Sequence, residues 1–215
     1  MTATTDLVPA LPGVPLARTA LALVTSTESA SIANHSIRSY LFAMMLAGHR
    51  GVDMDRDLDP HLLFFACVLH DIGLTDQGNR EQRFEVDGAD LAAEFLTAHG
   101  LPASDVDSVW EAIALHTSPG IAERRGLLCD LTRRGVGLDF GRDAEFVTDE
   151  QATAIHAAYP RLALATALAD EIVAQARARP AKAPRYSIAG ELLRERSVSG
   201  TTLLEEGAAG SRWGS

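Results

Sequence analysis

The adjacent pair His70-Asp71 is the feature of this sequence best suited to chemistry. The pair ends an apolar run with helical spacing. His70 lies four residues after Ala66, so His70 projects from the same apolar helix face as Ala66. A buried carboxylate and a buried imidazole are costly unless they are paired or bind a metal. The C-terminal end of a helix carries partial negative charge, which favours a cation there. The pair therefore predicts a metal site, with Asp71 also available as a catalytic base.

Two further residues are candidates for the same site. His35 lies near the start of a predicted helix, and Asp139 lies in the turn-like segment Gly135-Val-Gly-Leu-Asp-Phe140. Together with the HD pair they give two neutral imidazoles and two carboxylates, a neutral set around a divalent ion. Such mixed ligation suits zinc, iron(II) or manganese. A single buried histidine is more often a satisfied core residue, however, and an HD dipeptide also occurs by chance, so the residue types alone do not decide.

The elements that must position these residues are predicted to be helices. Asp59-Pro60 is a strong helix start, and Ser104 with Asp107 and Thr148 with Gln151 resemble capping boxes. Helices are expected over about 34–48, 60–73, 86–99, 104–115, 160–179 and 186–196, with a further helix start at Thr148, before Ile155. No alternating pattern is long enough for a sheet. We expect an all-α fold, a compact bundle of six to eight helices over 16–198, with an extended lead-in at 1–15 and a flexible tail at 199–215.

Composition restricts the partners. The chain has 215 residues and a net charge of −10, and its arginines are scattered rather than gathered in a stripe, which argues against nucleic acid. No uninterrupted apolar run is long enough to span a membrane. Cys67 and Cys129 lack CxxC spacing and are expected to be small buried hydrophobes, in keeping with a reducing cytoplasm. The expected partner is a small-molecule substrate, and a homo-oligomer is left open.

Four segments in order resemble one known family. They are Asn34-His-Ser-Ile-Arg38, Leu69-His-Asp-Ile-Gly73, Arg83-Phe-Glu-Val-Asp-Gly-Ala89 and Ala112-Ile-Ala-Leu-His-Thr117. Together they are similar to the HD-domain superfamily of metal-dependent hydrolases, in its cyanamide hydratase-like branch, over about residues 20–180. The resemblance implies the HD-type helical fold and one divalent metal ion, zinc or iron(II).

By motif position, the resemblance assigns the metal ligands to His35, His70, Asp71 and Asp139. Asp170 is the alternative last ligand, since many HD proteins place this residue inside a helix. The Gly-x-Gly-x-Asp turn favours Asp139. A second metal in this superfamily needs a histidine four residues before the Gly-Ala step, where this chain has Phe84, so a mononuclear site is expected. Glu85 remains a carboxylate that could hold a second, weak ion.

The resemblance also implies residues around the substrate. His116 is expected to be an acid/base or substrate-orienting residue, with a supporting role behind the ligands as the alternative. Arg83, Glu85 and Asp87 could form a charged rim of the pocket or simply a solvated helix start, and Thr117 could donate a hydrogen bond to substrate.

Three functions follow as alternatives. The first is a hydratase in which metal-activated water attacks a small nitrile such as cyanamide, giving an amide or urea. The second is an HD-type phosphohydrolase acting on a nucleotide or another small phosphoester, which would need basic residues beside the metal. The third is a non-catalytic ligand-binding protein that keeps the fold.

Overall fold

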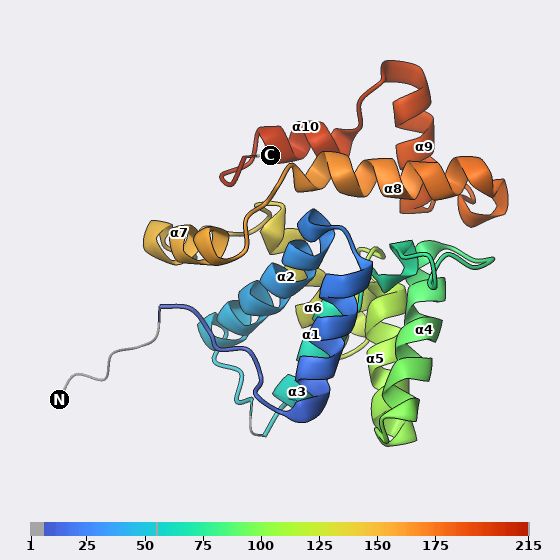
Figure 1. Ribbon diagram of the computed structural model, residues 1–215. Coiled ribbons are helices and arrows are strands. Elements are labelled where there is room, and N and C mark those ends of the chain that lie inside the picture. Colours follow the sequence, from blue (N-terminus) through green and yellow to red (C-terminus); the bar gives the residue numbers. More distant parts are fainter. Residues whose placement is uncertain (1–6, 55, 215) are drawn as a thin grey trace.

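The computed structural model describes residues 7–54 and 56–214, and over these residues the chain is helical with no strand. This confirms the all-α prediction, although the described residues form ten α-helices rather than six to eight (Figure 1). In chain order they are α1 Pro15–Thr27, α2 Ala30–His49, α3 Pro60–Val68, α4 Phe84–Ala98, α5 Ala103–Leu115, α6 Leu127–Asp139, α7 Asp149–Ala158, α8 Leu164–Ala178, α9 Ile188–Ser199 and α10 Leu203–Ala209. None of the helices in the described part is both long and apolar enough to cross a bilayer.

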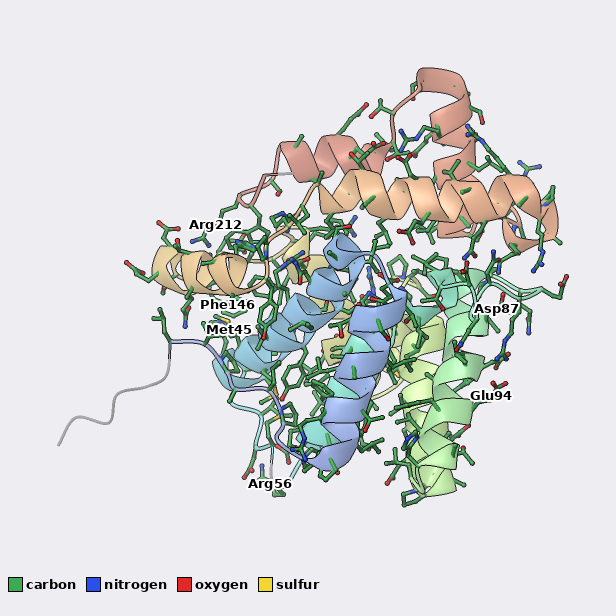
Figure 2. The ribbon with its side chains drawn as sticks, viewed as in Figure 1. Met45, Arg56, Asp87, Glu94, Phe146 and Arg212 are labelled. Atoms are coloured by element: carbon green, nitrogen blue, oxygen red, sulfur yellow. The ribbon has the colours of Figure 1, made fainter. Side chains whose placement is uncertain are left out.

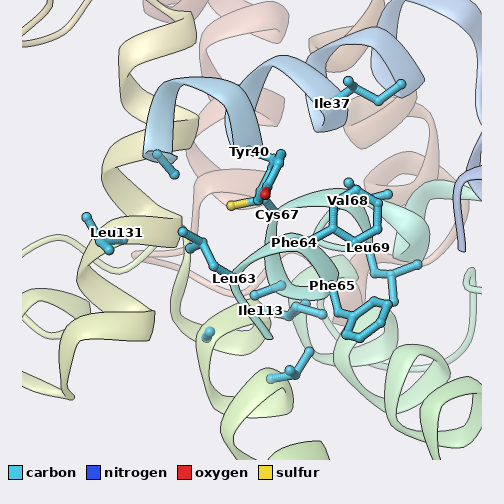
Figure 3. Close-up of a cluster of buried hydrophobic side chains, with 14 of the residues drawn as sticks. Ile37, Tyr40, Leu63, Phe64, Phe65, Cys67, Val68, Leu69, Ile113 and Leu131 are labelled. Atoms are coloured by element: carbon cyan, nitrogen blue, oxygen red, sulfur yellow. The ribbon is translucent and has the colours of Figure 1, made fainter. Parts of the chain in front are cut away.

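Two groups of helices make the fold. Helices α1 to α6 pack around one core, and α8, α9 and α10 lie across one end of that group (Figure 1). The core is centred on α3, which is apolar on every side and fully buried from Leu63 to Val68. Figure 3 shows Tyr40 of α2 above Phe64, with Leu131 of α6 and Ile113 of α5 around the same helix. The HD pair therefore follows the most deeply buried helix of the molecule.

The start of α3 follows the predicted signals, and its end depends on two glycines. Asp59 caps the helix by accepting a hydrogen bond from the His61 backbone N–H. After the HD pair, a short 3₁₀ turn, η1 (Ile72–Leu74), crosses the beginning of α4. A Cβ at Gly73 would overlap the carbonyl oxygen of Phe84 and lie 2.9 Å from the backbone nitrogen of Gly88. The close approach fixes the segment that carries His70 and Asp71.

Helix α6 corrects the expectation of a loop around Asp139. The segment from Gly135 is helical, and Asp139 is the last residue of α6. Glycine disfavours a helix by about 1 kcal/mol, but tertiary packing reverses this preference here. A Cβ at Gly135 would overlap the Ser39 carbonyl oxygen and lie 2.8 Å from the Ala43 Cβ, so glycine lets α6 approach α2 closely. That contact brings Asp139 beside His35.

Both ends of the chain hold a helix that was not among those expected, α1 and α10. Residues 1–6 of the expected lead-in lie outside the described residues, residues 7–14 form no helix, and α1 begins at Pro15. Within 199–215, where a flexible tail was expected, Thr202 and Glu205 form a capping box that starts α10. The Trp213 indole N–H donates to the Leu138 carbonyl, and Arg212 pairs with Asp149 above α7 (Figure 2).

Some helix starts differ as well. Helix α5 begins at Ala103 after Pro102, so the Ser104 capping box does not form, whereas the Thr148 box at α7 does. Helix α8 begins at Leu164 rather than Pro160, because Leu162 and Ala163 have positive φ values.

Candidate metal centre

Three potential ligand atoms without hydrogen-bond partners converge at the end of α3. His35 Nε2, His70 Nε2 and Asp71 Oδ2 are buried, and all lie within 4.8 Å of one another. The Nε2 atom of His70 is 3.1 Å from Asp71 Oδ2, and that of His35 is 3.9 Å from the same oxygen. Buried polar atoms are nearly always paired in folded proteins. Three unpaired ones facing a common point therefore fit a bound cation.

The hydrogen bonds behind these histidines select the tautomer that a metal needs. The Nδ1 atom of His70 lies 2.7 Å from the Cys67 carbonyl oxygen, which can only accept, so Nδ1 carries the proton. The Nδ1 atom of His35 lies 2.7 Å from Asp139 Oδ2 and donates to that carboxylate. Both Nε2 atoms then present lone pairs toward Asp71. His70 Nε2 and Asp71 Oδ2 are 3.1 Å apart, and their lone pairs repel unless a proton or a cation lies between them.

Asp139 lies on the opposite side of the His35 ring from this group. Its carboxylate accepts from Arg38 Nε and from Arg38 Nη2, each at 2.7 Å, in addition to His35 Nδ1. Arg161 donates to its backbone carbonyl and approaches Oδ1 at 3.3 Å. The structure thus brings together three of the four predicted ligands and leaves Asp139 outside their group. Both of its oxygens are already occupied, and the contact with His35 is the one that orients a metal-binding histidine from behind.

The charges of the site favour ionised carboxylates. Burial alone would raise the pKa of Asp139, but the Arg38 guanidinium outweighs it and holds this pKa well below the usual range. Burial would likewise raise the pKa of Asp71, whereas the charge of His70 lowers it. For His70, burial acts to lower the pKa, and the Asp71 charge reverses this and raises it. The negative potential that attracts a proton to His70 also attracts a metal cation, which competes with that proton.

His116 stands beside the ligand group as a neutral base. It caps the C-terminal end of α5, and its Nδ1 donates to the Ile113 carbonyl at 2.6 Å. Its Nε2 is 3.8 Å from Asp71 Oδ1, and its ring lies 4.8 Å from that of His70. Burial, and then the positive charge of His70, lower the pKa of His116 to about 3. Its Nε2 lone pair is therefore free at neutral pH.

A cavity of about 550 Å³ opens from this group toward the C-terminal helices. His35, His70, Asp71 and His116 form one part of its lining, and apolar side chains from α6, α8 and α10 line much of the rest. Thr117, a predicted donor to substrate, lines the cavity.

The other predicted substrate residues do not line the cavity. Asp87 accepts hydrogen bonds from the backbones of Arg80 and Gln82 and from Lys182 Nζ at 2.7 Å, so it fixes the loop before α4. Figure 2 places Asp87 on the end of α4 that faces the C-terminal helices. Glu85 is fully buried and accepts the Thr117 hydroxyl proton at 2.8 Å. Arg83 is near Glu85 at 3.9 Å.

Several residues at the site were missed from sequence. Arg38 lies three residues after His35, one helical turn away, so its spacing could have indicated a shared partner. His156 of α7 has a buried Nε2 without a hydrogen-bond partner, and this atom lies 3.9 Å from Asp139 Oδ1. The alternative ligand, Asp170, is exposed on α8 and pairs with Arg196, so it is remote from the ligand group.

Comparison with known proteins agrees with this geometry. A model of the HD domain matches residues 32–174, about two thirds of the chain. Two proteins of Saccharomyces cerevisiae, cyanamide hydratase DDI2 and cyanamide hydratase DDI3, are each 30% identical over 141 residues. That match covers 62% of this chain and 60% of each yeast protein. The matched HD segment contains His35, His70, Asp71, His116 and Asp139.

Proposed function

The chain belongs to the HD-domain family, and on that premise we propose that it is a mononuclear, metal-dependent hydratase acting on a nitrile-type substrate such as cyanamide. The family and the yeast relatives support a metal-dependent hydrolase or hydratase in general. One observation carries the proposal. Three unpartnered ligand atoms converge beside the His116 imidazole, and a cavity opens above them. The donors are two nitrogens and one oxygen, so zinc or iron(II) fits.

The residues of the site would divide the chemistry as follows. His35, His70 and Asp71 would hold a divalent ion, which when bound would lower the pKa of a water beside the substrate and so supply a nucleophile near neutral pH. His116 Nε2 would accept one proton of this water and pass it to the nitrile nitrogen as the water oxygen bonds to the nitrile carbon. The remaining water proton would then move from this oxygen to the same nitrogen, so that cyanamide plus water gives urea with no other reactant consumed.

Asp139 is proposed to act through His35. It fixes the ring and keeps the Nδ1 proton in place, so that Nε2 remains a ligand. Glu85 acts similarly through Thr117, whose only hydroxyl proton it accepts. The oxygen of Thr117 is then left as an acceptor, suited to an N–H of cyanamide or urea.

The proposal is tested by metal content and urea production. The purified protein should hold about one zinc or iron ion per chain and convert cyanamide to urea. Replacing His116 with Gln should retain the metal and lower kcat by about 10²- to 10⁴-fold, the usual contribution of a positioned acid/base group. His99→Gln is the matched control, since His99 Nδ1 also donates to a backbone carbonyl but on the surface. Full turnover in the metal-loaded His116→Gln variant would refute the proton-transfer role.

One observation favours a second candidate, phosphoester hydrolysis. Arg133 and Arg142 line the same cavity, and guanidinium groups bind phosphate well. Arg133 is already paired with Glu123 at 2.9 Å, which weakens this case. Release of phosphate from a small phosphoester by the metal-loaded protein, with no urea from cyanamide, would favour the second candidate over the first.

A further inference from the structure

The cavity above the ligand group is much larger than cyanamide requires. Cyanamide has three non-hydrogen atoms and occupies roughly 60–90 Å³, judged from about 30 Å³ for one water in the liquid. The cavity measures about 550 Å³. Pockets of about 300–1,000 Å³ are typical of ligands with many more atoms. A substrate of the size of cyanamide would leave most of this space to water.

Much of the lining of the extra space is apolar and comes from one part of the fold, although Arg133 and Arg142 also line the cavity. Leu168 and Ile172 of α8, Ile188 of α9 and Leu204 of α10 face the cavity, opposite Phe140 at the end of α6. Figure 1 shows α8, α9 and α10 lying across the end of the remaining bundle. These helices form a roof over the site, named here the C-terminal roof, and it presents hydrocarbon to the cavity.

Much of the C-terminal roof lies beyond the part of the chain that matches the family. The HD match ends at residue 174, whereas Ile188, Glu191 and Leu204 follow it. Glu191, the charged residue among these three, forms an ion pair with Arg194 at 2.8 Å. Polar groups for the reaction thus come from the matched segment, whereas part of the apolar lining, Ile188 and Leu204, comes from helices beyond it.

We infer that the preferred substrate is a nitrile or cyanamide carrying an uncharged apolar substituent of about benzyl size. The inference rests on the proposed hydratase activity and names its substrate class. The nitrile group reaches His116, and the substituent packs against the C-terminal roof. Hydration proceeds as above: water oxygen bonds to the nitrile carbon, and both water protons end on the product amide.

The first test compares substrates with the unaltered, metal-loaded protein. N-benzylcyanamide should be hydrated to N-benzylurea with a kcat/KM at least about 100-fold above that of cyanamide, because even one added methylene in an apolar pocket is worth about tenfold or more. Equal or higher kcat/KM for cyanamide would overturn the inference while leaving the proposed hydratase intact.

The second test uses two neighbouring leucines of α10. Leu204 lines the cavity, whereas Leu203 is 68% exposed. Leu204→Trp should lower kcat/KM for N-benzylcyanamide by about tenfold or more and that for cyanamide by less than about threefold. Leu203→Trp should change neither. Equal losses for both substrates in Leu204→Trp would contradict the inference.

A binding measurement separates failure of this inference from failure of the proposed function. If no nitrile is hydrated, the hydratase proposal fails, and titration with N-benzylurea then tests the pocket by itself. Binding of N-benzylurea that is stronger than binding of urea, and that is weakened by Leu204→Trp but not by Leu203→Trp, supports the apolar site. Equal affinity for the two ureas overturns it.

Discussion

Asp139 offers the sharpest test of how this site is built. Its replacement should have one effect if it is a direct metal ligand and another if it only positions His35. We expect Asp139→Asn to destabilise the metal-free protein by about 3 kcal/mol. The change leaves the Arg38 guanidinium, which is fully buried, without its carboxylate. Removing one partner of a buried pair costs about 3–5 kcal/mol, and the retained amide oxygen places the estimate at the lower end. Folded variant protein should bind zinc about 10- to 100-fold more weakly, as for the loss of a residue behind a ligand.

The assay combines urea unfolding of chelator-treated protein with a competitive zinc titration. Asp130→Asn is the matched control, since Asp130 also lies on α6 and pairs with Arg50 and Arg134, but with partly exposed partners. This control should lose no more than about 1 kcal/mol and keep its zinc affinity. If metal-free Asp139→Asn is as stable as the unaltered protein while zinc binding is abolished, Asp139 is a direct ligand and the reasoning from its contacts is refuted.

Three further outcomes are expected. Gly73→Ala should destabilise the protein by about 1–3 kcal/mol in urea unfolding, because its Cβ overlaps the Phe84 backbone, whereas Gly48→Ala, which meets no atom within 4 Å, should stabilise α2 by about 0.5–1 kcal/mol. In metal-free protein the pKa of His116 is lowered to about 3, so between about pH 6.5 and pH 3 the His116 imidazole takes up a proton only in the unfolded chain. The free energy of unfolding should therefore fall by up to about 1.4 kcal/mol per pH unit as the pH is lowered through this range. The His116→Gln variant should show a shallower decline than the unaltered protein. Zinc at 100 times its Kd should add about 2.7 kcal/mol to the free energy of unfolding and raise Tm, and His70→Ala should abolish that increase. An equal rise in Tm in His70→Ala would show that the ion binds elsewhere.

The HD pair and the helix that carries it could be predicted because their signals are local. Asp59-Pro60 marks the start of α3, and the apolar run that follows it requires burial on every side. His70 and Asp71 then follow within the same short segment. Such signals depend on neighbouring residues and on a helical period that a sequence displays directly.

The position of Asp139 could not be predicted in the same way. His35 and Asp139 are 104 residues apart, and their contact depends on how closely α6 approaches α2. The glycine that permits this approach reads locally as a helix breaker, because its packing benefit exists only in the folded state. Helix α10 was not predicted for the same reason. Leu204 and Trp213 look isolated in sequence, and their partners lie on α8 and α6.

The arrangement separates the chemistry of the site from the choice of substrate. The two imidazoles that face the cavity are each oriented by a group of the segment 32–174, so the contacts that orient them lie outside α9 and α10. Part of the apolar lining comes from those two helices, through Ile188 and Leu204, beside Leu168 and Ile172 of α8. A family member could therefore change its preferred nitrile by altering the C-terminal roof while keeping the same metal centre. This is why a metal titration and a substrate comparison test different parts of the molecule: Leu204→Trp should change the second and leave the first as it was.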